Sequence, residues 1–412
     1  MISRRHVFYL AGFDPIDAPA QHRRFTREIQ KFARTWHATA TVSELSIASH
    51  AVGTSWQAGA AGPNWQTQTT FELLDWQDIV RAEFPRPLAL QAIEGMVTFA
   101  DFIWSGAARQ YVTLAWRYGA FFAAPFLSVI ANTIIGLAVG IVVARLVTDN
   151  SILATAIVVL LACAVFALLI RWPGNRWHIR QGLVDWIFAR DFMYGRRPEM
   201  DKRLDQFAAR LVEASRTLEC DEFVIVGHSL GSTMAVMAIE RALKIDPDFA
   251  RRRKVCLLTV GSTIPKLAFH PAATYLRACT ARVAAEEGIS WTEYQARRDA
   301  ISFFRINPVT LQLSRSHGPN GKPCIREIGI KELMLPDVYA RNFFKHMRLH
   351  YQFVMGNERR AQYDFYMFVC GPAAFDELSE GSNGPLDLFD PEGLYRSKPR
   401  QAFASALQEK SA

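Results

Sequence analysis

The stretch that decides the fold is Glu222-Phe223-Val224-Ile225-Val226-Gly227-His228-Ser229-Leu230-Gly231. Its first half is a short apolar run, typical of a strand buried on both faces. The residues that follow, 233–243, have apolar side chains at helical spacing. Glycines on both sides of Ser229 permit a sharp turn between strand and helix. We therefore expect a strand, a tight turn that exposes Ser229, and a helix.

Further runs of strand length alternate with helical segments on both sides of this unit. We expect the other strands at 7–11, 40–47, 66–73, 255–260, 289–295 and 325–334. The other helices are expected at 21–36, 76–83 and 203–216. Strands that alternate with helices indicate an α/β fold with a mostly parallel sheet flanked by helices.

Two uncharged apolar runs, 118–144 and 150–170, interrupt this alternation. Both exceed the ~18 residues that mark a membrane-spanning helix. Only a few residues separate the runs, so the two helices must form an antiparallel hairpin. The sequence thus predicts a transmembrane hairpin over 118–171, inserted into the α/β domain.

Positive charge is distributed unequally around this hairpin. The turn carries Arg145, which Asp149 offsets, whereas the flanks carry Arg109, Arg117, Arg171, Arg176, Arg180 and Arg190. By the positive-inside rule, both termini and the α/β domain are expected in the cytoplasm, on the inner or plasma membrane if the source is bacterial.

The segment before the hairpin, 88–117, has few charges and apolar residues at helical spacing. It is expected either to lie in the membrane interface, with its apolar face bordering the substrate pocket, or to pack on the soluble domain. The chain then divides into 1–87 and 172–380 as two parts of one domain, 88–117 as an interfacial segment, 118–171 as the hairpin and 381–412 as a flexible tail.

The net charge of +8 suits anionic lipid head groups as well as nucleic acid. No nucleic-acid-binding module is recognisable, so membrane lipids are the expected partner. The six cysteines are scattered without a C-x-x-C pair, and they are expected to be reduced thiols.

Ser229 is the candidate nucleophile, because a G-x-S-x-G turn holds a hydroxyl clear of the backbone where a carbonyl carbon can reach it. With Gly227-His228-Ser229-Leu230-Gly231 in this context, the sequence resembles the α/β-hydrolase superfamily, its lipases and esterases in particular. The resemblance covers 7–12 weakly and about 205–372 more clearly. The membrane hairpin is a departure from the usual soluble enzyme.

The resemblance implies a triad in the chain order serine, acid, histidine. Asp299, which follows the strand predicted at 289–295, is the expected acid; the alternative is a surface carboxylate paired with a neighbouring arginine. His350 is the expected base, and His346 is the alternative. The two histidines could also face a metal from one helix, but no third ligand is apparent, and no metal is expected.

The resemblance also implies an oxyanion hole. The Leu230 amide is expected to supply one donor and the Phe13 amide, in the loop 12–15, the other, although that loop could be an ordinary turn. Together these features imply hydrolysis of an apolar or lipid-like carboxylic ester without a cofactor. A thioesterase, amidase or acyltransferase would use the same residues. A non-catalytic membrane scaffold remains an alternative from another class.

Overall fold

The computed structural model describes residues 1–47, 53–313 and 321–396. Within these residues, one nine-stranded sheet has the order β2-β4-β5-β1-β6-β7-β8-β9, with β3 paired to β4. Its strands are β1 (Arg4–Leu10), β2 (Thr39–Val42), β3 (Ser46–Ile47), β4 (Gly53–Gly62), β5 (Trp65–Leu74), β6 (Glu222–His228), β7 (Val255–Val260), β8 (Ile289–Ala296) and β9 (Cys324–Ile328).

The strands from β5 to β9 in this order are parallel, and β2, β3 and β4 form an antiparallel edge. The predicted α/β class with a mostly parallel sheet flanked by helices is therefore confirmed. β1 and β6 are neighbours at the centre, with Val7 opposite Val224. The segments before and after the apolar hairpin thus contribute adjacent strands of one sheet.

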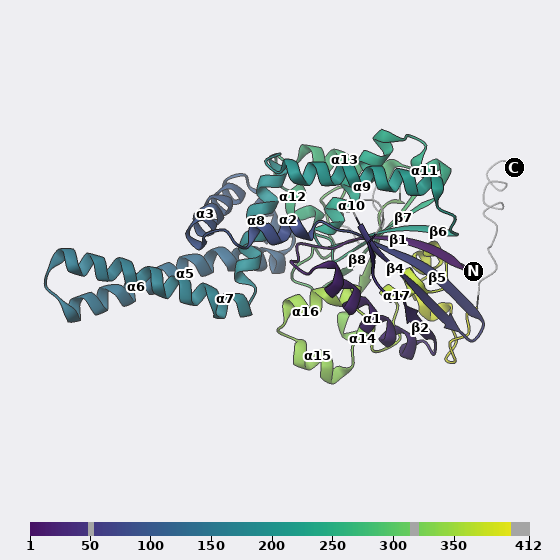
Figure 1. Cartoon of the computed structure of the whole chain (residues 1–412), viewed down its shortest axis with the longest axis horizontal. Helices are drawn as coiled ribbons and strands as arrows, with labels where there is room; N and C mark the ends of the chain where they lie inside the picture. Colours follow the sequence, from purple (N-terminus) through teal and green to yellow (C-terminus); the bar gives the residue numbers. More distant parts are fainter. Residues whose placement is uncertain (48–52, 314–320, 397–412) are drawn as a thin grey trace.

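Helices cover both faces of this sheet (Figure 1). Side chains alternate along β1, so that Phe8 and Leu10 enter one core while Val7 and Tyr9 enter the other. The first core is covered chiefly by α2 (Gln77–Glu83), α8 (Ile179–Met193), α9 (Pro198–Thr217), α10 (Gly231–Ile245), α12 (Ile264–Ala268) and α13 (Thr274–Ala285). The second is covered by α1 (Ala18–Thr35), α14 (Ile330–Leu333), α16 (His346–Tyr351), α17 (Phe365–Cys370) and α18 (Phe375–Glu380).

Three segments differ from the sequence-based expectation. β4 was not predicted, because its many glycines and alanines give a weak strand pattern. The strand predicted at 325–334 ends at Ile328, and the chain continues as α14 from Ile330. Residues 381–396, assigned to the tail, pack on the domain, where the Phe389 ring lies 5.3 Å from that of Trp36. Residues 397–412 lie outside the described residues.

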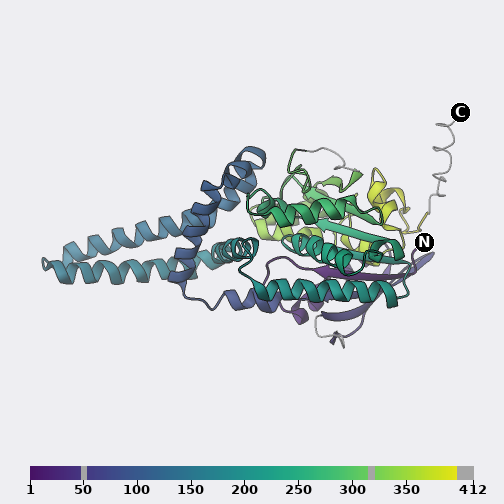
Figure 2. The same cartoon turned by 90° about the horizontal axis from the view of Figure 1, so that it is seen from above.

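Two helices, α5 (Trp116–Val147) and α6 (Ser151–Arg171), are long and apolar enough to cross a membrane. They form the predicted antiparallel hairpin, which projects from the α/β domain (Figures 1 and 2). Gly136 and Gly140 lie where the helices touch: a Cβ at these positions would come within 2.7 Å of Ala162 O and 2.8 Å of Val158 Cα. This G-x-x-x-G spacing permits close backbone contact between apolar helices.

The first turns of α5 belong to the domain core. Tyr118, Phe122 and Phe126 are almost fully buried, although the sequence placed them in the membrane span. Gly136 lies against Ala162 and Gly140 against Val158, so each step back along α5 corresponds to one step forward along α6. Extending this antiparallel pairing toward the domain places Leu127 opposite Arg171. The projecting part of α5 therefore matches the 21 residues of α6, a length of about 30 Å at 1.5 Å per residue and close to the thickness of a bilayer's hydrocarbon core.

The segment 88–117 forms α3 (Leu88–Trp104) and α4 (Ala107–Leu114), followed by the start of α5. One face of α3 packs on α8, where a Cβ at Gly95 would overlap the Leu183 side chain. The opposite face is exposed and apolar, with Ile93 at 64% and Trp104 at 85% exposure. The segment thus packs on the soluble domain by one face of α3 and exposes an apolar stripe on the other, and its location in a membrane interface stays a prediction.

Glu293 on β8 is expected to make stability depend on pH. It is buried, accepts hydrogen bonds from Thr259 and Gln295, and burial raises its pKa from 4.5 to about 7. The unfolded chain releases this proton near pH 4.5 and the folded chain near pH 7, so stability is lost between these values, by about 3 kcal/mol. We expect Glu293→Gln to remove this loss, which is measurable by denaturant unfolding at pH 4, 6 and 8. A difference from the wild type that does not grow with pH would contradict the assignment.

Candidate active site

Ser229 lies at the sharp turn between β6 and α10, as the sequence predicts. Its φ of 56° is in the left-handed region, which residues other than glycine rarely occupy. The amide of Ser229 donates to Val260 O, and its carbonyl accepts from Ser232 and Thr263. These bonds to the neighbouring strand and helix hold the strained backbone in place.

Glycine is required beside this turn by close approach of the β1 backbone. A Cβ at Gly231 would lie 2.1 Å from the Leu10 carbonyl oxygen. A Cβ at Gly12, in the loop after β1, would lie 2.8 Å from Ser229 Cβ and 3.3 Å from its Oγ. The end of β1 therefore forms one wall around the hydroxyl.

His350 and Asp299 are brought together from different elements. His350 Nδ1 lies 2.7 Å from Asp299 Oδ2, and both side chains are almost fully buried. Asp299 follows β8, and its other oxygen accepts from the Ile301 amide. His346, the alternative base, is exposed on the same helix. Of the two histidines, His350 is the one that bonds the predicted acid.

Ser229 and His350 line the same small cavity. Within the described part of the chain, His350 Nε2 is buried and has no hydrogen-bond partner, so no bond joins it to Ser229 Oγ. The imidazole lies close to Gly261, where a Cβ would come within 2.9 Å of His350 Cε1. The ring is thus held at the cavity wall with one nitrogen fixed by the acid and the other unengaged.

The two predicted oxyanion donors flank this cavity. Phe13 lines it, and Leu230 follows Ser229 directly at the start of α10. Among the residues described by the structure, neither the Leu230 nor the Phe13 amide donates a hydrogen bond. Both N–H groups therefore have no competing acceptor.

The loop after β1 is tied to the helix of the histidine. The Tyr351 hydroxyl donates to Asp14 Oδ2, and Asp14 Oδ1 accepts from the Ile16 amide. The Arg24 guanidinium lies 4.9 Å from the centre of the Tyr351 ring. The contacts of Tyr351 with Asp14 and Arg24 were not predicted, because no local motif marks contacts between such distant segments.

His228, inside the G-x-S-x-G motif, forms a second wall that the sequence did not single out. Its ring centre lies 4.8 Å from that of His350. Burial, followed by the charge of His350, lowers the pKa of His228 well below its ordinary value. A neutral His228 adds no positive charge that would oppose protonation of His350.

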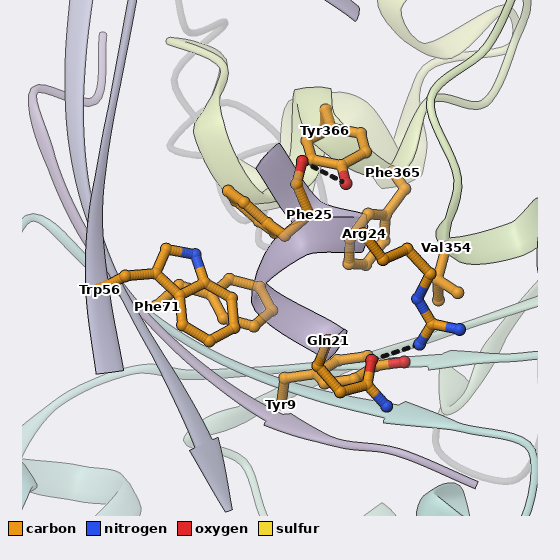
Figure 3. A pocket seen from close by; sticks show the side chains of 9 residues that line it. All are labelled: Tyr9, Gln21, Arg24, Phe25, Trp56, Phe71, Val354, Phe365 and Tyr366. Carbon is orange, nitrogen blue, oxygen red and sulfur yellow. Dashed lines mark hydrogen bonds between the residues drawn. The ribbon is translucent and has the colours of Figure 1, made fainter. Parts of the chain in front are cut away.

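A second cavity is lined by residues of β1 and α1 among others (Figure 3). Most of its walls are aromatic, including Tyr9, Trp56 and Phe71. Arg24, which stacks on Tyr351, donates to Gln21 at its edge. This cavity belongs to the packing that supports α1 and does not contain Ser229.

Among residues 1–47, 53–313 and 321–396, no group of three histidine, cysteine or acidic side chains could hold a metal ion. Comparison with known proteins gave no match to a family model, to a curated protein or to a solved structure. The function therefore has to be inferred from the site itself.

Gly12→Ala is expected to crowd the Ser229 side chain. The added methyl would lie within 3.3 Å of Ser229 Oγ, so we expect a fluorophosphonate to label Ser229 at least about tenfold more slowly. The thermal unfolding midpoint, measured in parallel, should show that the variant still folds. An unchanged labelling rate in the folded variant would mean that this loop does not border the reacting hydroxyl.

Proposed function

We propose that this chain is a membrane-anchored serine hydrolase of the α/β-hydrolase type that cleaves carboxylic esters. The observation that carries the proposal is the shared cavity of Ser229 and His350, in which His350 Nδ1 faces Asp299 and Nε2 is unpartnered. The strained backbone of Ser229 and the unpartnered, buried Nε2 of His350 both lower the stability of the fold, which a site with only a structural role would have no reason to retain. They are what acyl transfer requires.

In this mechanism Asp299 accepts a hydrogen bond from the Nδ1–H of His350, which keeps the proton on Nδ1 and leaves Nε2 free to accept a proton. As His350 Nε2 takes the proton of Ser229 Oγ, the oxygen attacks the ester carbonyl carbon. The tetrahedral oxyanion is held by the Leu230 and Phe13 amides. His350 then gives its proton to the departing alcohol, and water repeats the sequence on the acyl-enzyme to release the carboxylic acid. No step needs a metal or an organic cofactor.

The position of the cavity supports an apolar, lipid-like ester as substrate. Phe121 of α5 and His178, which directly precedes α8, line it. Both residues lie close to the points where the chain enters and leaves the apolar hairpin. An ester in a bilayer would reach Ser229 from this side without transfer of its acyl chain into water, which costs about 0.8 kcal/mol per methylene.

The apolar stripe of α3 does not provide this entrance. Ile93, Met96 and Trp104 line a separate groove whose other wall is formed by Val129 and Thr133 of α5. The groove shares no lining residue with the Ser229 cavity. We therefore assign the stripe to contact with membrane lipid and the entrance to the side of Phe121 and His178.

Hydrolysis of thioesters or amides, or acyl transfer to another alcohol, would use the same residues. A non-catalytic scaffold is the second class of function. It predicts that Ser229 has ordinary reactivity, so chemical labelling separates the two.

We expect a fluorophosphonate to label Ser229, and Ser229→Ala to abolish both labelling and ester cleavage. His350→Ala should reduce turnover by several powers of ten, since loss of a triad member removes the activated nucleophile. The matched control is His346→Ala, which removes an exposed histidine from the same helix and should leave turnover unchanged. Unaltered turnover in Ser229→Ala would eliminate this mechanism.

The proposed topology places both termini and the α/β domain in the cytoplasm, with the α5–α6 turn on the other side. In a background without native cysteines, Thr148→Cys should react with an impermeant thiol reagent added outside intact cells. Arg176→Cys should react only after permeabilisation, because arginines flank the domain side of the hairpin. Release of the protein by carbonate washing, or equal labelling at both sites, would contradict the spanning arrangement.

A further inference from the structure

One face of α8 crosses the Ser229 cavity. Gln181, Gly182 and Asp185, together with the preceding His178, line it at helical spacing. The other walls include the apolar side chains of Phe13, Phe121, Ile301 and Met347. The cavity thus has a polar stripe opposite apolar walls, as a site for an amphiphilic molecule requires.

Asp185 forms an ion pair with a buried lysine. Its Oδ2 lies 2.6 Å from Lys266 Nζ, and the Lys266 side chain is only 2% exposed. The ammonium group also lies 4.4 Å from the centre of the Trp186 ring. Asp185 lines the cavity, whereas Lys266 does not.

The second carboxylate oxygen of Asp185 is unused. Oδ1 is buried and has no hydrogen-bond partner among the described residues. Leaving a buried acceptor unpaired is unfavourable, and such groups in folded proteins usually meet a water or a ligand. Since Lys266 offsets the carboxylate charge, the pair favours a neutral donor over a second cation.

We propose that Asp185 recognises a hydroxyl group on the alcohol part of the ester, which makes the preferred substrate an acyl ester of a polyol with a free hydroxyl, such as a monoacylglycerol. This inference rests on the proposed hydrolase function. Asp185 Oδ1 accepts the hydroxyl proton in a hydrogen bond, Lys266 fixes the carboxylate, and the apolar walls contact the acyl chain. Asp185 is thus a specificity residue, and it takes no part in bond cleavage.

The test compares two esters of one fatty acid, monooleoylglycerol and propyl oleate, in detergent micelles. They differ in the hydroxyl groups of the alcohol. The wild type should favour monooleoylglycerol in kcat/KM by about tenfold or more, as expected for a hydrogen bond to a charged acceptor. Asp185→Leu combined with Lys266→Met removes both charges together, which avoids leaving one buried alone. This double variant should lower the ratio to within about twofold of unity, with propyl oleate turnover retained.

The matched control is Asp101→Leu combined with Arg190→Met. It removes an ion pair of 2.7 Å near the other end of α8, outside the Ser229 cavity, and should keep the wild-type ratio. If the first double variant does not fold, Asp185→Asn keeps the shape with a neutral acceptor and should lower the ratio at least about threefold.

Two results would overturn the proposal: no wild-type preference for monooleoylglycerol, or an unchanged ratio in the folded Asp185 variants, whether or not turnover of both esters falls. Fluorophosphonate labelling of Ser229 is measured on each protein. Labelling with no hydroxyl preference rejects this inference alone, whereas a wild type that neither labels nor cleaves either ester rejects the hydrolase function as well.

Discussion

The parallel pairing of β1 with β6 is the contact on which the site depends. It joins segments from the two sides of the apolar hairpin, with Leu10 opposite Gly227 at its end. Immediately beyond, Gly231 approaches the Leu10 carbonyl so closely that no side chain fits. The loop that carries Phe13 is thereby set beside Ser229. Ser229 and Phe13 are neighbours only because these two strands are.

This pairing also explains why the hairpin can be inserted without dividing the domain. The chain leaves the sheet at the carboxyl end of β5 and returns to it at the amino end of the parallel strand β6, and α8 and α9 lead the chain from the hairpin back to that end. The first turns of α5 and the whole of α8 pack into the same core, where Phe122 and Trp186 rings lie 4.7 Å apart. Buried aromatic contacts therefore attach the base of the hairpin to the domain.

Periodicity and motif predict much of this structure. The parallel strands are apolar runs of the right length, and glycines at fixed spacing mark the turn at Ser229. Asp299 and His350 followed from chain order, and the structure brings them within 2.7 Å. The burial of Tyr118, Phe122 and Phe126 in the domain was not predicted, because an uncharged helix has the same sequence pattern whether lipid or a protein core surrounds it.

The sequence did not predict the contacts between residues that lie far apart along the chain. Nothing local to Tyr351 indicates Asp14 as its partner, and nothing local to Lys266 indicates Asp185. Such pairs arise from how helices dock, which depends on side-chain fit across the whole core. They are also the contacts that shape the cavity, so a motif identifies the reacting groups more readily than it identifies a substrate.

The hairpin and the site are coupled through α8. This helix begins where the chain returns from α6, packs on α5 at Gly182 and Pro125, and lines the cavity with Asp185. Phe121, on α5 itself, lines the cavity as well. Removing the hairpin would take away Phe121 and the support of α8, and so would alter the cavity wall. The apolar insertion thus forms part of the cavity wall. Under the proposed function, its attachment to a membrane would fix the direction from which a substrate arrives.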